Sequence, residues 1–113
     1  MPVVILLAIP KLYRDHMSDV ELYEATRCTW EVSEEGRQAE LAMAVSKGIV
    51  REVYRIKRWC PAGTLVYQIR KFKFPIDSSL WEFEGEVAID VRDQYVDQPA
   101  PVRNYGEIAY MNI

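Results

Sequence analysis

The stretch from residue 39 to residue 59 constrains the fold most, because its pattern is typical of a β-hairpin. Leu41, Met43 and Val45 alternate with other residues at a period of two, which is the period of a strand with two distinct faces. A short turn at residues 46–48 follows, and its glycine tolerates the positive φ that such turns need. We therefore expect a central hairpin around which the rest of the chain is arranged.

The return strand of this hairpin is predicted to have one apolar and one basic face. The apolar side chains that suit the core are Val50, Tyr54 and Ile56. The opposite face carries a row of cations that ends in an aromatic ring: Arg51, Arg55, Lys57 and Trp59. We call the first three the basic stripe. It is either a solvated sheet face balanced by Glu82, Glu84 and Glu86, or a surface that contacts phosphate.

The length of 113 residues indicates a single domain, 1–113, with enough chain for a core that needs neither disulfides nor metal. The net charge of −3 argues against a nonspecific nucleic-acid coat. The charge is unevenly spread, however, because residues 51–73 hold seven basic side chains and one acidic one. An acidic chain with one basic segment is typical of a bounded anion-binding patch, or of strands that neutralise an acidic neighbour.

Two cysteines and one histidine, Cys28, Cys60 and His16, are the only residues of these types. They form no C-x-x-C pair and are too few for a zinc site, so we predict no metal and no cofactor. Both thiols are expected to stay free in a reducing cytoplasm. The apolar run at residues 3–9 is far shorter than the roughly 20 residues that span a bilayer, so we predict a buried strand and no membrane contact.

Local signals predict the remaining elements. Ser18 and Glu21 form a capping box, which predicts a helix over 19–27, and Asp90 can cap a second short helix over 90–96. Further strands are expected at 28–32, 64–74, 80–88 and 107–113, with a bulge at Gly85. Together these elements predict an α+β fold, a small, strongly bent mixed β-barrel with two short flanking helices.

Several stretches resemble a small uncharacterised bacterial protein family. They are L-Y-E-A-T-R-x-x-W at 22–30, A-x-A-V-x-x-G-I-V-R-E-V-Y-x-I-x-x-W at 42–59, W-x-F-x-G-E-V-A-x-x-x-R-x-x-Y-V at 81–96 and Y-x-N at 110–112. The layout is also similar to the PUA-like barrel superfamily, which includes the EVE, ASCH and YTH domains. That resemblance implies binding of RNA or of a modified base in a pocket on the barrel and, for some ASCH relatives, a hydrolase. The chain lacks a catalytic signature of the hydrolase branch.

The predicted nucleic-acid site combines aromatic and cationic side chains. Trp30 and Trp59 form a slot in which a base stacks, or else both belong to the core. Arg27 lies on the same helix side as Tyr23 and needs an acceptor if it is buried; it either pairs with Glu24 or points into a cleft. The complete predicted set is Arg27, Trp30, Arg51, Arg55, Lys57, Trp59 and Arg70.

These features favour noncatalytic recognition of RNA or DNA, single-stranded or with a modified base. One alternative is a small enzyme, an ASCH-like hydrolase that acts on a nucleoside-like substrate. His16 could be its general base, and Thr26, Glu24 and Lys47 have the residue types of an amidohydrolase, but no catalytic residue is assigned. Another is a protein-interaction module that uses the acidic last third of the chain. Recognition predicts an open basic groove, an enzyme a closed polar pocket, and an interaction module a flat apolar patch.

Overall fold

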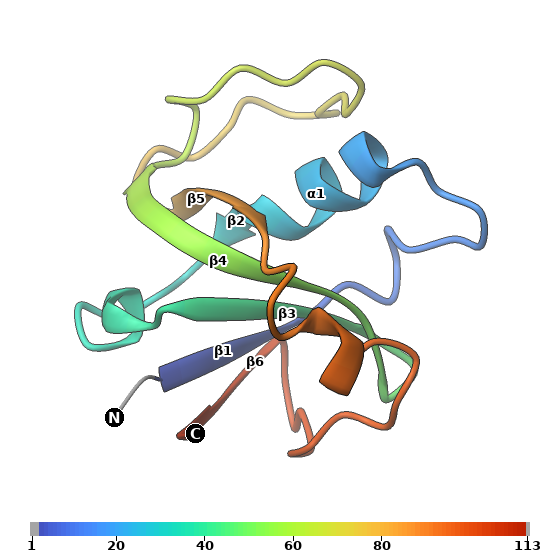
Figure 1. Ribbon diagram of the computed structural model, residues 1–113. Coiled ribbons are helices and arrows are strands. Elements are labelled where there is room, and N and C mark those ends of the chain that lie inside the picture. Colours follow the sequence, from blue (N-terminus) through green and yellow to red (C-terminus); the bar gives the residue numbers. More distant parts are fainter. Residues whose placement is uncertain (1–2, 113) are drawn as a thin grey trace.

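A computed structural model describes residues 3–112, which form one six-stranded mixed sheet and one α-helix (Figure 1). The elements are β1 (Val3–Ala8), α1 (Asp19–Arg27), β2 (Cys28–Trp30), β3 (Leu41–Ser46), β4 (Ile49–Pro61), β5 (Trp81–Val87) and β6 (Ile108–Asn112). The strand order is β2-β5-β4-β3-β1-β6, in which β1 and β3 are parallel and the other neighbours are antiparallel. The sheet curls into a half-barrel with β2 and β6 as its edges, so the predicted bent mixed sheet is present, but open.

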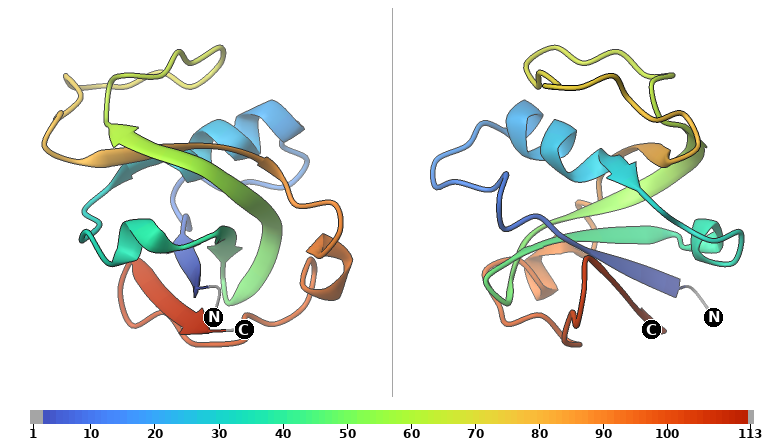
Figure 2. Two further views of the ribbon diagram at one scale, coloured as in Figure 1. Left: turned by 60° about the vertical axis from the view of Figure 1, so that its left-hand side comes forward. Right: turned by 180° about the vertical axis from the view of Figure 1, so that it is seen from behind.

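The predicted central hairpin is confirmed as β3 and β4. Ser46 pairs with Ile49 across a two-residue turn, in which Lys47 and Gly48 have φ values of 54° and 74°. The 13-residue strand β4 bends across the sheet, so that its first half pairs with β3 and its second half with β5 (Figure 2). This hairpin therefore joins the two halves of the curled sheet.

Two bulges in β4 break the alternation that a regular strand would keep. Arg51 is an extra residue opposite the Ala44–Val45 step of β3, and Lys57 is an extra residue opposite the Glu84–Gly85 step of β5. Each extra residue moves the following side chains to the opposite face. The basic stripe is therefore not one continuous row, and the single-face prediction for it is wrong.

The bulge predicted at Gly85 lies where Lys57 is inserted. A Cβ atom at Gly85 would collide with the backbone carbonyl oxygen of Arg55, which explains why this position has no side chain. Beyond the first bulge, Val53 packs on the same face as Val50. Trp59 packs on the opposite face, with Tyr54 and Ile56.

Both faces of the sheet are buried. On the face covered by α1, Ile5 and Leu7 of β1 pack with Tyr54 and Phe83. On the other face, Val4 and Leu6 lie in a second cluster, which the segment after β5 covers with apolar side chains: Val91, Tyr95, Val96, Ala100 and Val102. These four β1 residues are fully buried, which accounts for the uninterrupted apolar run near the start of the chain.

Residues 64–74 form no strand, so that prediction is wrong. They belong to an excursion, residues 62–80, that lies above α1 in Figure 1 and that we call the 62–80 loop. Two buried carboxylates hold the amides that a sheet ladder would use. Glu24 accepts hydrogen bonds of 2.6–2.8 Å from the amides of Gln68, Ile69 and Arg70. Glu82 accepts from the amides of Thr64 and Leu65 at 2.8 and 2.7 Å.

One α-helix is present in residues 3–112, where the sequence predicts two. The capping box is confirmed, since the Ser18 hydroxyl accepts from the Glu21 amide at 3.1 Å and the Glu21 carboxylate from the Ser18 amide at 3.2 Å. The second helix is reduced to the 3₁₀ turn Arg92–Gln94. Its expected cap, Asp90, instead accepts two hydrogen bonds of 2.9 Å from Arg55.

The two cysteines are free thiols and both are buried. Cys28 of β2 and Cys60 of β4 lie on either side of Glu82 of β5 in one row of the sheet. Two strand spacings separate their backbones by roughly 10 Å. This separation is larger than a disulfide allows.

Candidate functional site

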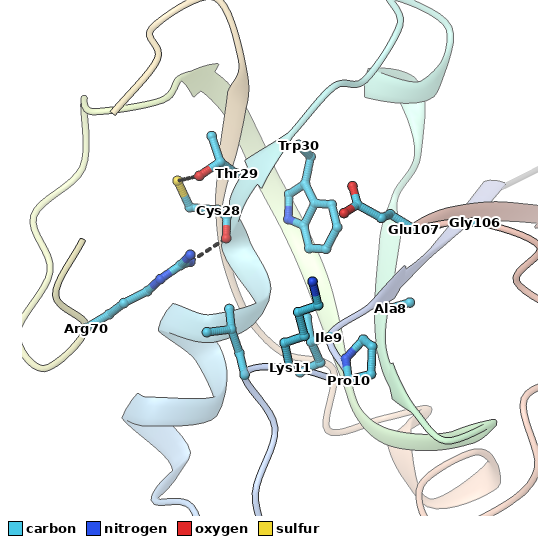
Figure 3. A pocket seen from close by; sticks show the side chains of 11 residues that line it. Ala8, Ile9, Pro10, Lys11, Cys28, Thr29, Trp30, Arg70, Gly106 and Glu107 are labelled. Carbon is cyan, nitrogen blue, oxygen red and sulfur yellow. Dashed lines mark hydrogen bonds between the residues drawn. The ribbon is translucent and has the colours of Figure 1, made fainter. Parts of the chain in front are cut away.

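A cavity of about 550 Å³ opens where β1 ends, beside β2 and the start of β6 (Figure 3). We call it the central cavity. Its wall combines residues 8–12, the three residues of β2, Arg70 from the 62–80 loop, and the pair Gly106 and Glu107. Its volume lies within the roughly 300–1,000 Å³ range of small-molecule sites.

Trp30 is both a core residue and part of the cavity wall. Its side chain is 5% exposed and packs in the cluster beneath α1. The indole Nε1 donates a hydrogen bond of 2.7 Å to the carbonyl oxygen of Thr26, which fixes the orientation of the ring. The small exposed part of this ring gives the cavity a rigid apolar contact that a ligand can use without ordering the protein further.

Two cations and one carboxylate lie around the same space, namely Lys11, Arg70 and Glu107 (Figure 3). The Arg70 Nη1 donates to the carbonyl oxygens of Glu24, at 3.1 Å, and of Cys28. Burial lowers the pKa of Arg70. Within residues 3–112 no acceptor lies on Nε or Nη2 of Arg70, and no carboxylate oxygen lies within 4.0 Å of the Lys11 amine. The cavity can therefore offer positive charge to an anion.

Arg27 is held between two aromatic rings and does not line the cavity. Its guanidinium carbon lies 4.8 Å from the ring centre of Tyr23 and 4.3 Å from that of Tyr67, and Nη2 donates to the carbonyl oxygen of Val66. Burial alone would lower the pKa of Arg27, but the contacts with the two tyrosines raise it. The predicted acceptor, the Glu24 carboxylate, binds loop amides instead.

Two cations of the basic stripe are already paired with carboxylates. Arg55 contacts Asp90 at 2.9 Å, and Lys57 lies 3.6 Å from Glu86. Their neighbour Arg58 is paired in the same way, 3.0 Å from Glu84. A phosphate would have to displace these partners. For Glu84 and Glu86, this arrangement matches the first interpretation given above, a solvated sheet face balanced by acidic side chains. Glu82, the third expected partner, is instead buried beneath the 62–80 loop.

The remaining predicted site residues, Arg51 and Trp59, lie elsewhere. Arg51 is 4.5 Å from the ring centre of Tyr13 and donates to the Ser46 carbonyl oxygen at 3.1 Å. Trp59 packs edge-on against Phe83, with 5.4 Å between the ring centres. Of the seven predicted residues, the structure therefore brings Trp30 and Arg70 together at the central cavity, and leaves the other five outside its wall.

The groups proposed for a hydrolase are engaged in structural contacts or exposed. The Thr26 hydroxyl is fully buried and donates to the Leu22 carbonyl oxygen at 2.7 Å, and His16 is exposed. The sulfur of Cys28, a residue of the cavity wall, lies 3.0 Å from the Thr29 hydroxyl. In the part of the chain from 3 to 112, no three potential metal-ligating side chains come together. An aromatic wall with cations is suited to binding a planar anion.

Sequence reasoning missed Lys11 and Glu107. A signal for Lys11 was present, because it follows Pro10, which lies just beyond β1, a strand with four fully buried central residues. Ligand sites in open sheets tend to form in the loops just beyond such strand ends.

Comparisons of the chain with protein-family models, with curated proteins and with solved structures give no match. Across residues 3–112, no helix has the length and apolar character needed to cross a membrane.

Proposed function

We propose that this protein recognises one nucleotide of a nucleic acid in the central cavity, without catalysis. The observation that carries the proposal is the convergence of Trp30, Arg70 and Lys11 on a single cavity of about 550 Å³. We further infer that the half-barrel belongs to the PUA-like class, which the curled six-stranded sheet and its single helix support.

Each wall of the cavity matches one part of a nucleotide. The small exposed part of the Trp30 ring offers a rigid apolar contact for a base. Arg70 and Lys11 offer positive charge for a phosphate. The pair Gly106 and Glu107 adds a carboxylate that can accept a hydrogen bond from an exocyclic amine.

Binding of labelled single-stranded RNA and DNA, and of duplexes with and without a modified base, tests the proposal. Fluorescence anisotropy at about 50 and 200 mM salt measures both the affinity and its salt dependence. The informative variant is Lys11→Gln, because this exposed side chain has no carboxylate partner within residues 3–112. Lys73→Gln is the matched control, since Lys73 is exposed and does not line the central cavity.

We expect Lys11→Gln to weaken binding several-fold and to reduce the salt slope by about 0.7, the value for one phosphate contact on a single strand. Lys73→Gln should bind as the original protein does. Absence of binding at the lower salt concentration, or equal binding by both variants, would contradict the proposal.

A further inference from the structure

Two further cavities adjoin the central cavity. The first, of about 520 Å³, lies between the β3–β4 turn and residues 100–106, and we call it the turn-side cavity. The second, of about 280 Å³, lies between the segment before α1 and residues 69–71, and we call it the helix-side cavity. Together the three cavities form what we call the trench.

Shared wall residues show that the three cavities are neighbours. The turn-side cavity shares Ala8, Pro10 and Gly106 with the central cavity, and the helix-side cavity shares Leu12 and Arg70 with it. In Figure 3, Arg70 lies on one side of the central cavity, and Pro10 and Gly106 lie on the other. The trench therefore extends beyond the central cavity in two directions.

The trench is basic although the chain is acidic overall. Its basic side chains are Lys47, Arg103, Lys11, Arg70, Arg14 and Lys71. Its acidic side chains are Glu107 and Glu21. Positive charge concentrated along a groove raises the local concentration of a polyanion and steers its approach.

Most of these cations have no carboxylate partner. Arg14 is paired with Glu21, but within residues 3–112 no carboxylate oxygen lies within 4.0 Å of the other five. The cations Arg55, Lys57 and Arg58 differ from these five, because each of them is paired with an acidic residue. A phosphate can therefore contact any of these five cations without displacing a protein carboxylate from it.

We propose that the trench binds the backbone of a single-stranded nucleic acid, so that the central cavity receives an internal nucleotide of that strand. This inference rests on the proposed function. A free mononucleotide needs only the cations of the central cavity, whereas cations in three successive cavities match the repeated charge of a strand.

An exposed aromatic ring beside the turn-side cavity favours a single strand. Tyr105 is 90% exposed and follows Asn104, which lines that cavity. The guanidinium carbon of Arg103 lies 5.3 Å from the centre of the Tyr105 ring. Exposed rings beside cations are the stacking surfaces that single-strand-binding proteins use for successive bases.

A length series tests the trench. The probes are a nucleoside monophosphate and a single strand of about eight nucleotides, a length within the roughly 4–16 nucleotides bound by small barrel domains. The variant Lys47→Glu/Arg103→Glu reverses the charge of the turn-side cavity and leaves the central cavity unchanged. Lys57→Glu/Lys73→Glu is the matched control, since it changes the net charge equally at exposed positions outside the trench.

We expect Lys47→Glu/Arg103→Glu to weaken binding of the longer strand at least tenfold, to lower its salt slope by about 1.4, and to leave monophosphate binding unchanged. Binding of the longer strand at the original affinity would overturn the trench, as would an equal loss in the control. If longer strands bind in a Lys11-dependent manner but ignore the turn-side variant, the trench fails and the proposed function stands. If binding ignores Lys11 as well, the proposed function fails.

A second variant tests whether a strand passes from the central cavity to the turn-side cavity, by blocking the space and not by changing its charge. Gly106 lies in the wall shared by the central and turn-side cavities, and a Cβ atom there would meet no other atom within 4 Å. Gly106→Leu should therefore narrow the passage without disturbing the core, and Gly106→Ala is its smaller control. We expect the leucine variant to lose affinity for the longer strand several-fold more than for the monophosphate. If Gly106→Leu and Gly106→Ala bind the longer strand with equal affinity, a strand does not pass between the two cavities.

Discussion

The Glu24 carboxylate in α1 accepts a hydrogen bond of 2.8 Å from the Arg70 amide, and the Arg70 guanidinium donates one of 3.1 Å to the Glu24 carbonyl oxygen. The two residues lie 46 positions apart in the chain. This reciprocal contact holds the 62–80 loop against α1 and places Arg70 in the wall of the central cavity. The geometry of the cavity therefore depends on one buried carboxylate.

Replacement of Glu24 by glutamine should destabilise the protein. The variant side chain has nearly the same shape, but its amide group places a donor where the loop amides also donate. We expect a loss of about 2–3 kcal/mol in the free energy of unfolding, because hydrogen bonds to a charged, buried group are lost. Urea unfolding measures the loss, and hydrogen exchange at residues 68–70 locates it.

The matched control for this variant is Glu84→Gln. Glu84 contacts Arg58 at the surface of the sheet, so its replacement should change stability far less than that of Glu24. If Glu24→Gln is as stable as Glu84→Gln and its loop amides are as well protected, the anchoring role of Glu24 is wrong.

The buried Glu24 carboxylate should also make the stability of the protein depend on pH. Burial alone would raise the pKa of Glu24, but the amides of Arg70, Gln68 and Ile69, together with the Arg27 charge, hold it below its ordinary value of 4.5. Because the folded pKa is lowered, the stabilisation is fully present above pH 4.5 and is lost as the pH falls through the folded value. Unfolding free energies measured between neutral and acidic pH should fall less steeply in Glu24→Gln than in the original protein. If the unfolding free energy depends on pH equally in Glu24→Gln and in the original protein, this account is wrong.

The two candidate slot residues should differ in their effect on stability. Trp30 is 5% exposed and bonds to the Thr26 carbonyl oxygen, so Trp30→Ala should cost about 3–5 kcal/mol. Trp59 is only partly buried and packs against the edge of the core, so Trp59→Ala should cost clearly less. Chemical denaturation of both variants checks the order. A small loss for Trp30→Ala would show that its ring serves the cavity and not the core.

The basic stripe can be separated from the trench by the double variant Arg55→Glu/Lys57→Glu. Both cations are paired with acidic side chains, and neither lines a cavity of the trench. We therefore expect single-strand binding to stay within about twofold of the original, because the proposed binding depends on the unpaired cations of the trench. Anisotropy titration gives the answer. Loss of binding in a variant that still folds would restore the basic stripe as the contact surface.

Local sequence signals predicted the elements that are fixed by neighbouring residues. The hairpin, the capping box at Ser18 and the buried strand β1 each follow from patterns within a few residues. The 62–80 loop could not be predicted in this way. Its alternating sequence suits a strand, but carboxylates at positions 24 and 82 take up the backbone amides of the loop.

The candidate site was predictable in residue type but not in position. Trp30 and Arg70 were expected to bind a ligand, and they line one cavity. Strict alternation placed Arg51, Arg55 and Lys57 on one face, which the two bulges in β4 prevent. Lys11, Lys47 and Arg103 come from three separate loops, and only the folded chain brings them to one trench.

Glu24 and Glu82 hold the 62–80 loop mainly through its backbone, and this separates the shape of the loop from much of its sequence. The exposed side chains of Val66 and Ile69 take no part in the bonds that their segments make to the two carboxylates. Such positions can accumulate substitutions while the main-chain path and the placement of Arg70 persist. The loop is thus a natural site for diversification, where a randomised library would vary ligand preference on an unchanged scaffold.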